Sequence, residues 1–469
     1  MNWLLPISLL PLLAGLGALL RPAAGRPALT VMGWALWAGM ATATGLGLAA
    51  GTGMIALDWL AFAITVLTLF VGAIVIGFSR RHMKADPRLH LYVFRIGLLI
   101  ASVLIFVSAR DLLSLALAWL ASGWLLAALI GHVPGWVEAG AARRRALIAF
   151  AWGDAALVVA LAILGLFAGG LSLDRALAAV PGLPAGVQAA LAALLLVAAM
   201  ARSAVPPFHK WLMGSMTAPT PVSALMHAGL VNAGGFLLIR FAPLLDAAPV
   251  VQWAAIAIGA LGALFGTGVM IVRPDVKRAL GGSTLAQMSF MIMTCGLGAY
   301  AAALWHLIAH GLFKAWLFLG AGSTIGRARP SQLAPLSVAD TAIVTIAAAA
   351  LAAVVIGRGL TATLPLPLLF ALLTALASFA GLLRAPGRIG AQAMLALVST
   401  GLVAAYLGGV HLVEALPGLP AARALPPLGL QLAVMLPFIA AWAWQAARLP
   451  LPTTLYIRML NTGGPALIR

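Results

Sequence analysis

Apolar residues fill long windows along the chain, and short segments rich in Pro, Gly or Arg separate them. A helix that crosses a bilayer needs roughly 20 such residues. Fifteen windows are long enough, namely 3–20, 28–50, 55–78, 91–108, 112–131, 145–169, 185–204, 217–241, 249–272, 276–296, 300–325, 337–357, 364–383, 389–409 and 427–447. The pattern predicts an all-α polytopic membrane protein of about 14–15 transmembrane helices.

No long polar linker separates the windows, so we expect a single transmembrane domain over residues 1–469. The first window has no basic segment before it, which favours a retained span over a cleaved signal peptide. The segment 448–469 is too short to fold alone. We expect it to be a short cytoplasmic tail, either lying on a surface or docked against the helices.

Composition supports the membrane assignment, since 63% of residues are hydrophobic and 8% are charged. A soluble globular domain of this size does not have such a composition. The net charge of +18 is explained by basic loops on one side of a membrane, so no nucleic-acid partner is implied. The lone Cys295 excludes an internal disulfide framework and a cysteine-based metal site.

The basic residues alternate between loops. Loops after odd-numbered windows carry Arg21, Arg26, Arg80, Arg81, Lys84, Arg88, Arg143 to Arg145, Lys210, Arg273, Lys277, Arg278, Arg327, Arg329, Arg384, Arg388, Arg448, Arg458 and Arg469. Loops after even-numbered windows carry only Arg110, Arg175, Arg240, Arg358 and Arg423. Because basic loops stay in the cytoplasm, we predict an external N-terminus and a cytoplasmic C-terminus.

Three ionisable residues lie within the window 300–325. His306, His310 and Lys314 follow one another at steps of four, which on a helix gives a stripe roughly 12 Å long on one face. A Lys near the centre of a membrane helix costs on the order of 3 kcal/mol. We therefore expect the stripe to be used, and movement of a proton is the use that suits these groups.

A metal site is the alternative for the two histidines, because their spacing suits a metal ion. No carboxylate or thiolate lies nearby in the sequence, and Lys314 one turn further on would repel a cation. We expect neither a metal nor a cofactor in this chain.

The segment 201–218 breaks the helical pattern. Pro206 and Pro207 remove two backbone donors just after Arg202, which predicts a discontinuous helix. Irregular backbone at membrane depth survives only inside protein or beside water. Arg202 then either faces an internal polar axis or extends from the last turn to the cytoplasmic interface.

Other polar residues interrupt neighbouring windows. His227 is either a hydrogen-bonded packing residue or a transport group, and Asn232 nearby favours a hydrated interior. Asp154 lies in an apolar run and requires a basic partner, for which we predict Arg202. Asp58, Asp111 and Asp275 stand near helix starts and are expected to cap them.

From 201 to 325 the chain resembles the antiporter-like proton-translocating subunits of respiratory complex I, Mrp antiporters and membrane hydrogenases. The resemblance is carried by ARSAVPPFHKWL, MTAPTPVSALMHAGLVNAGGFLLIR, RPDVKRALGGSTLAQMSFM and HLIAHGLFKAWLFLGAGSTI, and more weakly by IALDWLAF and ARDLLSLALAWL. It implies an antiporter-like core over about 55–325 and divergent helices over 337–447. It also implies that His306, His310, Lys314 and His227 lie on the proton path, with Arg202 at the position of a family Lys.

The chain departs from that pattern in three respects. The family's Glu after Trp119 is Leu120, and its broken-helix Lys is Arg202, which does not readily lose a proton. Beyond Ile325 we find no second broken helix with a Lys and no long lateral helix.

The DabB family, membrane subunits of an inorganic-carbon accumulation complex, departs similarly, and SMTAPTPVSALMHAGLVNAGGFLLIRFAPL is especially similar to it. This resemblance implies a bacterial inner-membrane protein that conducts cations, protons or sodium. Their flow would energise one-way CO2 hydration by a DabA-like cytoplasmic partner, which would hold the zinc and carry the enzymatic chemistry.

Two alternatives remain open. One is a proton-translocating subunit of a complex I-type NADH-quinone oxidoreductase or of an Mrp-type antiporter. The other is a scaffold whose ion path has decayed, as Leu120 and Arg202 suggest. The stripe at His306, His310 and Lys314 argues against a scaffold, because a scaffold gains nothing from desolvating these groups.

Overall fold

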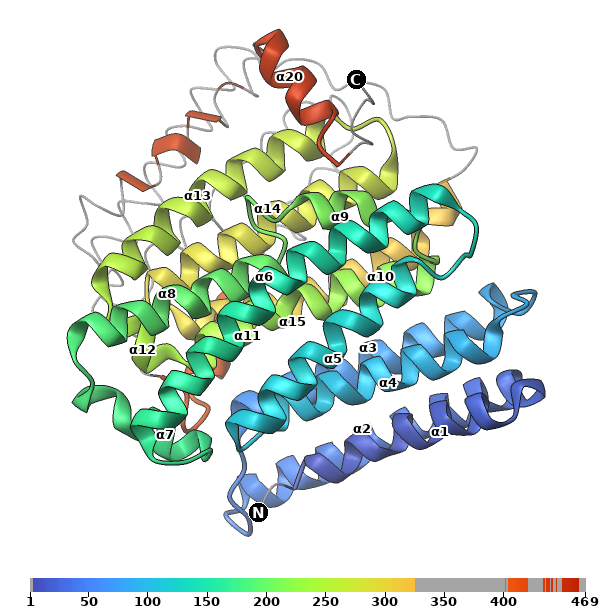
Figure 1. The fold of residues 1–469 in the computed structure, drawn as a ribbon, viewed down its shortest axis with the longest axis horizontal. Coiled ribbons are helices and arrows are strands. Elements are labelled where there is room, and N and C mark those ends of the chain that lie inside the picture. Colours follow the sequence, from blue (N-terminus) through green and yellow to red (C-terminus); the bar gives the residue numbers. More distant parts are fainter. Residues whose placement is uncertain are drawn as a thin grey trace.

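The computed structural model describes residues 3–324, 401, 404–420, 433–434, 436–438, 440–441, 444 and 449–463. Within these ranges the chain forms helices and no strand, and the long helices lie side by side with their axes roughly aligned (Figure 1). The long helices are α1 (Leu9–Leu20), α2 (Gly25–Gly51), α3 (Trp59–His82), α4 (Leu89–Ser108), α5 (Leu112–Ile130), α6 (Val137–Ala168), α8 (Ala185–Arg202), α13 (Pro249–Val272), α14 (Val276–Gly296) and α15 (Tyr300–Gly320). The short helices are α7 (Leu173–Ala179), α9 (Lys210–Gly214), α10 (Thr220–Ala228), α11 (Ala233–Arg240), α12 (Ala242–Asp246) and α20 (Thr453–Leu460).

The first eleven predicted windows each coincide with a helix or a pair of helices. Among the described residues, nine helical segments are long and apolar enough to cross a membrane. The helix α14 is long enough but is not among the nine, because it carries more polar residues. The predicted windows 337–357 and 364–383 lie outside the described residues, as do most of 389–409 and 427–447. The all-α, multi-pass membrane architecture is confirmed.

Several helices extend beyond their predicted windows at the basic end. The helix α6 begins at Val137 instead of residue 145, and α3 continues to His82 instead of residue 78. Arg143 to Arg145 are therefore in the first turns of α6 and not in a loop. Hydropathy marks only the part of a helix that lies in the bilayer, while Ala and Arg continue the helix beyond it.

Aspartates begin three of these helices, as the sequence predicted. Asp58 accepts a hydrogen bond from the Ala61 amide at 3.0 Å, and Asp111 accepts one from the Ser114 amide at 2.7 Å. Asp275 caps α14 through the Arg278 amide at 2.8 Å. Each carboxylate satisfies an amide that has no partner within its helix.

The helices α13 and α14 pack closely together. A Cβ at Gly259 or Gly266 of α13 would overlap backbone atoms of α14, so only glycine permits this approach. Small residues at such spacing are typical of helix packing in membranes. The helices α10 and α14 both pack against α15. The predicted window 217–241, which begins with α10, and the polar helix α14 therefore lie beside the stripe of His306, His310 and Lys314.

The segment 449–463 docks against the end of the bundle that carries the basic loops. Arg273 donates to the Thr462 carbonyl, and Arg145 donates to the Gly463 carbonyl at 3.3 Å. Met459 of α20 is buried against α13, near which α20 lies (Figure 1). Of the two possibilities for the tail, the structure shows docking, while Tyr456 of α20 stays exposed.

Candidate functional site

The helix α15 carries the histidine–lysine stripe on one face, as predicted. The rings of His306 and His310 stack with centroids 5.8 Å apart. His310 and Lys314 are buried, with 2% and 0% of their surface exposed, and His306 is half-buried. Two ionisable groups are thus fully enclosed within the bundle.

The helix α14 supplies the hydrogen-bond partners of this stripe. Lys314 Nζ donates to Ser283 Oγ at 2.8 Å and to the Leu280 carbonyl at 3.4 Å. His310 Nδ1 lies 2.5 Å from Gln287 Oε1, and Gln287 Nε2 lies 3.5 Å from Ser283 Oγ. Side chains therefore connect Lys314 to His310 without a break.

Sequence reasoning missed Ser283, Thr284 and Gln287. The signal was present, because these three polar residues lie at positions i, i+1 and i+4 of the window 276–296 and so fall on one side of the helix. They were not predicted because the candidate residues were chosen by their ionisable side chains, and these three are uncharged.

The helix α10 brings His227 to the same place. Its Nδ1 is 3.0 Å from Thr284 Oγ1, and its ring stacks on Phe318 at 4.0 Å between centroids. Its carbonyl oxygen lies 3.1 Å from His310 Nε2. We call the connected set Lys314, Ser283, Gln287, His310 and His227 the polar chain.

The predicted span 217–241 is interrupted just after His227. The helix α10 ends at Ala228, and a 3-10 turn, Leu230–Asn232, precedes α11. Asn232 Nδ2 donates to the carbonyls of Ala228 at 2.9 Å and of Leu307 in α15 at 3.2 Å. Ser203 Oγ donates to the Val231 carbonyl at 2.6 Å. Asn232 and Ser203 thus satisfy the carbonyls of Ala228 and Val231 at the interruption, where backbone groups at membrane depth need partners.

A small cavity of about 30 Å³ adjoins the interruption. Apolar side chains of α3, α4 and α11 form most of its lining, with Thr68 and Asn232 as its polar members. Asn232 Oδ1 is buried and has no hydrogen-bond partner among the described atoms.

The predicted break after Arg202 is present. The helix α8 ends at Arg202, Ala204 has a positive φ of 55°, and α9 starts at Lys210. The Ala201 carbonyl accepts a hydrogen bond from Trp211 Nε1 at 2.9 Å, so α9 folds back against the end of α8. Arg202 faces the interior with 1% of its surface exposed, which excludes an extension to the interface.

The predicted contact between Arg202 and Asp154 is confirmed, with Nη2 and Oδ1 3.1 Å apart. Arg202 also donates to Ser122 Oγ at 2.8 Å and to the Trp119 carbonyl at 3.0 Å. Trp119 Nε1 donates to the same Asp154 oxygen at 2.8 Å, and the Trp119 ring lies 4.3 Å from the guanidinium carbon. We call Arg202, Asp154, Trp119 and Ser122 the arginine cluster.

The six predicted site residues thus fall into two groups. Lys314, His310 and His227 join the polar chain, with His306 stacked on it, whereas Arg202 and Asp154 belong to the arginine cluster. None of the hydrogen bonds between described residues joins the two groups directly. The interrupted span contacts both sides: its Val231 carbonyl accepts a hydrogen bond from Ser203, next to Arg202, and its Asn232 donates to Leu307 of α15.

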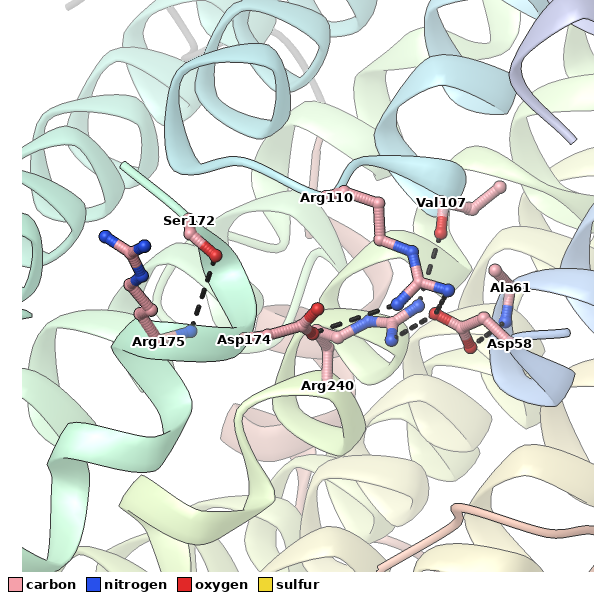
Figure 2. A network of polar contacts seen from close by, with 8 residues as sticks. All are labelled: Asp58, Ala61, Val107, Arg110, Ser172, Asp174, Arg175 and Arg240. Atoms are coloured by element: carbon pink, nitrogen blue, oxygen red, sulfur yellow. Dashed lines mark hydrogen bonds and ion pairs between the residues drawn. The ribbon is translucent and has the colours of Figure 1, made fainter. Parts of the chain in front are cut away.

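A second ionic network ties helix ends together on the side opposite the tail (Figure 2). Arg240 at the end of α11 donates to Asp58 at 2.6 Å and to the Val107 carbonyl at 3.3 Å. Arg110 lies 4.0 Å from Asp58 and 3.8 Å from Asp174. Asp58 therefore caps α3 and anchors the second half of the interrupted span.

A polar network also lies at the opposite ends of α3, α4 and α5. His132 Nε2 is 2.9 Å from Asp86 Oδ2, and Arg88 donates to the His132 carbonyl. Burial lowers the pKa of His132, and the Asp86 carboxylate only partly offsets this effect. His132 is therefore neutral near pH 7 despite its acidic neighbour.

A family model described as NADH:quinone oxidoreductase/Mrp antiporter, transmembrane, matches residues 109–401. That match covers more than half of the chain, so the protein belongs to this family of antiporter-like membrane proteins. The resemblance to DabB is also confirmed. The chain is 39% identical over 327 residues to the probable inorganic carbon transporter subunit DabB1 of Halothiobacillus neapolitanus, covering 67% of this chain and 57% of that protein.

Other relatives also belong to complexes of the oxidoreductase and Mrp antiporter types. The NADH-quinone oxidoreductase subunit L of Mycobacterium tuberculosis is 37% identical over 275 residues, which cover 57% of this chain and 43% of the relative. Among solved structures, the Mrp complex from Dietzia sp. DQ12-45-1b has a chain that matches with a TM-score of 0.62 at 27% identity, covering 98% of this chain and 52% of that one. The chain spans about half the length of the curated relatives it matches.

Proposed function

We propose that this chain is the membrane subunit of an inorganic-carbon accumulation complex and that it conducts protons down their gradient. The flow would energise one-way CO2 hydration by a cytoplasmic zinc protein resembling β-carbonic anhydrases. Its DabB relatives are probable inorganic carbon transporter subunits, which supports the inorganic-carbon role. The chemistry of hydration belongs to the partner and not to this chain.

The polar chain is the observation that carries the proton-conducting part of the proposal. It connects a buried lysine, a buried histidine and hydroxyl and amide groups across three packed helices. Burying such groups at membrane depth costs several kcal/mol, so a chain without a use for them gains nothing by keeping them. Lys314 would hold a proton between two half-paths, and His310 would be its next acceptor.

The arginine cluster has a different task in this proposal. A guanidinium stays charged, so Arg202 is a fixed cation and does not carry the proton. Its charge disfavours protons on nearby groups, and Asp154 balances it. The groups that hold the proton are then Lys314 and His310, and not Arg202.

Affinity purification of the tagged chain from its native membrane tests this function. We expect one cytoplasmic zinc protein to co-purify, and we expect cells that lack this chain to lose inorganic-carbon uptake. Recovery of a set of respiratory subunits would contradict the proposal.

A second candidate is a proton-translocating subunit of an Mrp-type antiporter or a complex I-type oxidoreductase. The 27% identity to a chain of an Mrp complex over 98% of this chain favours it. Sodium-dependent proton exchange in vesicles, without a zinc partner, is its distinguishing result.

A further inference from the structure

His310 stands between two oxygen atoms. Its Nε2 is 3.1 Å from the backbone oxygen of His227, and its Nδ1 is 2.5 Å from Oε1 of Gln287. Both partners are acceptors, whereas a neutral imidazole has one N–H to donate. The arrangement in the structure therefore satisfies both oxygens only when His310 carries two protons.

A neutral His310 requires a different arrangement at one of its two nitrogens. The His227 carbonyl belongs to α10 and is fixed by the helix, so Nε2 keeps its hydrogen. The amide of Gln287 can turn about its last side-chain bond, which has two broad, equivalent minima. Turning places the amide nitrogen against Nδ1, where it donates, and the amide oxygen against Ser283.

We propose that Gln287 is a two-position switch that couples the protonation of His310 to that of Lys314. This inference rests on the proposed function for its purpose but not for its geometry. With the proton on Lys314, Nζ donates to Ser283, Ser283 donates to the Gln287 oxygen, and the Gln287 nitrogen donates to neutral His310.

With the proton on His310, every one of these hydrogen bonds reverses. His310 Nδ1 donates to the Gln287 oxygen, and the Gln287 nitrogen donates to Ser283. The Ser283 hydroxyl then donates to the lone pair of neutral Lys314, the reverse of the contact in the structure, where Nζ is the donor. Both directions satisfy every group. With both protons present, Ser283 Oγ accepts from Lys314 and from Gln287, its own hydroxyl hydrogen has no acceptor left in the polar chain, and two like charges lie close together. The orientation of the Gln287 amide sets the direction of the hydrogen bonds on both of its sides. No proton passes through the amide itself.

The surroundings of His310 contain few other groups that titrate. His306 and Lys314 face it from α15, and His227 faces it from α10. The ionisable residues of α3, α14 and α11 stand at helix ends, namely Arg80, Arg81, His82, Lys277, Arg278 and Arg240. The described segment 404–420, which meets α15 at Trp305, adds Tyr406, His411 and Glu414. Among the described residues, no hydrogen bond or ion pair joins a carboxylate to His310. Coupling along the polar chain is thus distinguishable from the effect of a nearby carboxylate.

Nitrogen-15 NMR of histidine-labelled full-length protein in lipid nanodiscs tests the switch. The His310 signals are assigned as those missing in a His310→Asn variant, and the half-titration pH of His310 is measured. We expect Lys314→Met to shift this half-titration pH by more than about one pH unit when Gln287 is present. In a Gln287→Leu background, we expect the shift to fall to less than half of that value.

Controls separate the switch from general disturbance of the fold. Gln287→Met keeps the length of the side chain without its hydrogen bonds and should behave like Gln287→Leu. Gln252→Leu removes an amide from α13 that bonds Asp246, and should leave the full shift intact. Equal shifts in the presence and absence of Gln287 would overturn the proposal. The NMR titration does not depend on transport. A result on inorganic-carbon uptake therefore tests the proposed function and leaves the switch untouched, while the titration tests the switch.

Discussion

Arg202 and Asp154 form a buried ion pair between the end of α8 and α6, with 3.1 Å between Nη2 and Oδ1. Every polar contact of this pair comes from within the bundle, and Trp119 bonds both partners. The pair thus fixes the end of the discontinuous helix to two neighbouring helices.

Removing one partner of this pair should destabilise the protein strongly. Arg202→Ala or Asp154→Ala leaves a buried charge without its partner, which typically costs about 3–5 kcal/mol. The double variant strands neither charge and should recover part of the folded yield. Yield and thermal unfolding in detergent measure this. As a control, Arg278→Ala breaks an exposed pair with Asp275 and should have little effect.

Gly123→Ala should disturb the same pair from α5. A Cβ at this position would lie 2.9 Å from Arg202 Nη2, so the guanidinium must move. Overpacking of this kind typically costs about 1–3 kcal/mol. Gly140→Ala in α6 meets no neighbour within 4 Å and is the matched control. Similar melting temperatures for both variants would show that the arginine cluster adapts freely.

Lys314→Ala should leave the complex assembled but abolish inorganic-carbon uptake, since the proposal makes Nζ the proton-holding group. Lys314→Arg should fail too, because a guanidinium does not release its proton. Lys84→Ala, which removes an exposed lysine from a loop, should retain uptake. Normal uptake by Lys314→Ala would favour the scaffold.

Orientation in the membrane is open to chemical labelling. A cysteine at Arg144, which is exposed near the start of α6, should be shielded from an impermeant external thiol reagent. A cysteine at Thr52, in the exposed turn after α2, should react. Cys295 is buried and contributes little background. The opposite labelling would invert the predicted topology.

The stability of the protein should fall in mild acid partly because of His132. Its pKa is lowered in the folded state by burial, so as pH falls below about 6.5 the unfolded chain takes up this proton first. Stability from this site is present above that pH and is lost below it. The difference in melting temperature between about pH 7.5 and about pH 5.5 should be smaller for His132→Gln. An unchanged difference would remove His132 as a cause.

Hydrophobic windows predicted the described helices well, because the membrane requires long apolar segments. They did not predict the basic extension of α6, since residues outside the bilayer need not be apolar. The interruption after Ala228 also escaped prediction. Gly229 by itself is compatible with a helix, and the partners that make the break possible, Asn232 and Ser203, are recognisable only once the chain has folded.

The candidate site was predictable where charge was involved. Placing Lys314, His310, Arg202 or Asp154 in an apolar helix costs so much that each demanded a partner or a use. Placing neutral Ser283 or Gln287 in an apolar helix costs far less free energy. The sequence therefore offered no reason to assign them a function, although they connect the ionisable groups. Their role depends on which face of α14 meets α15, and packing decides that.

The docked segment 449–463 has a consequence for biosynthesis. These residues are synthesised after the described helices that they contact, so Arg145 and Arg273 receive their Gly463 and Thr462 partners only after those helices have been made. Until then α9, which Gly463 covers at Met213, lies open beside the discontinuous helix. Closure of this contact therefore requires that helices made early and a segment made late have come together, so it follows the assembly of the bundle at that end.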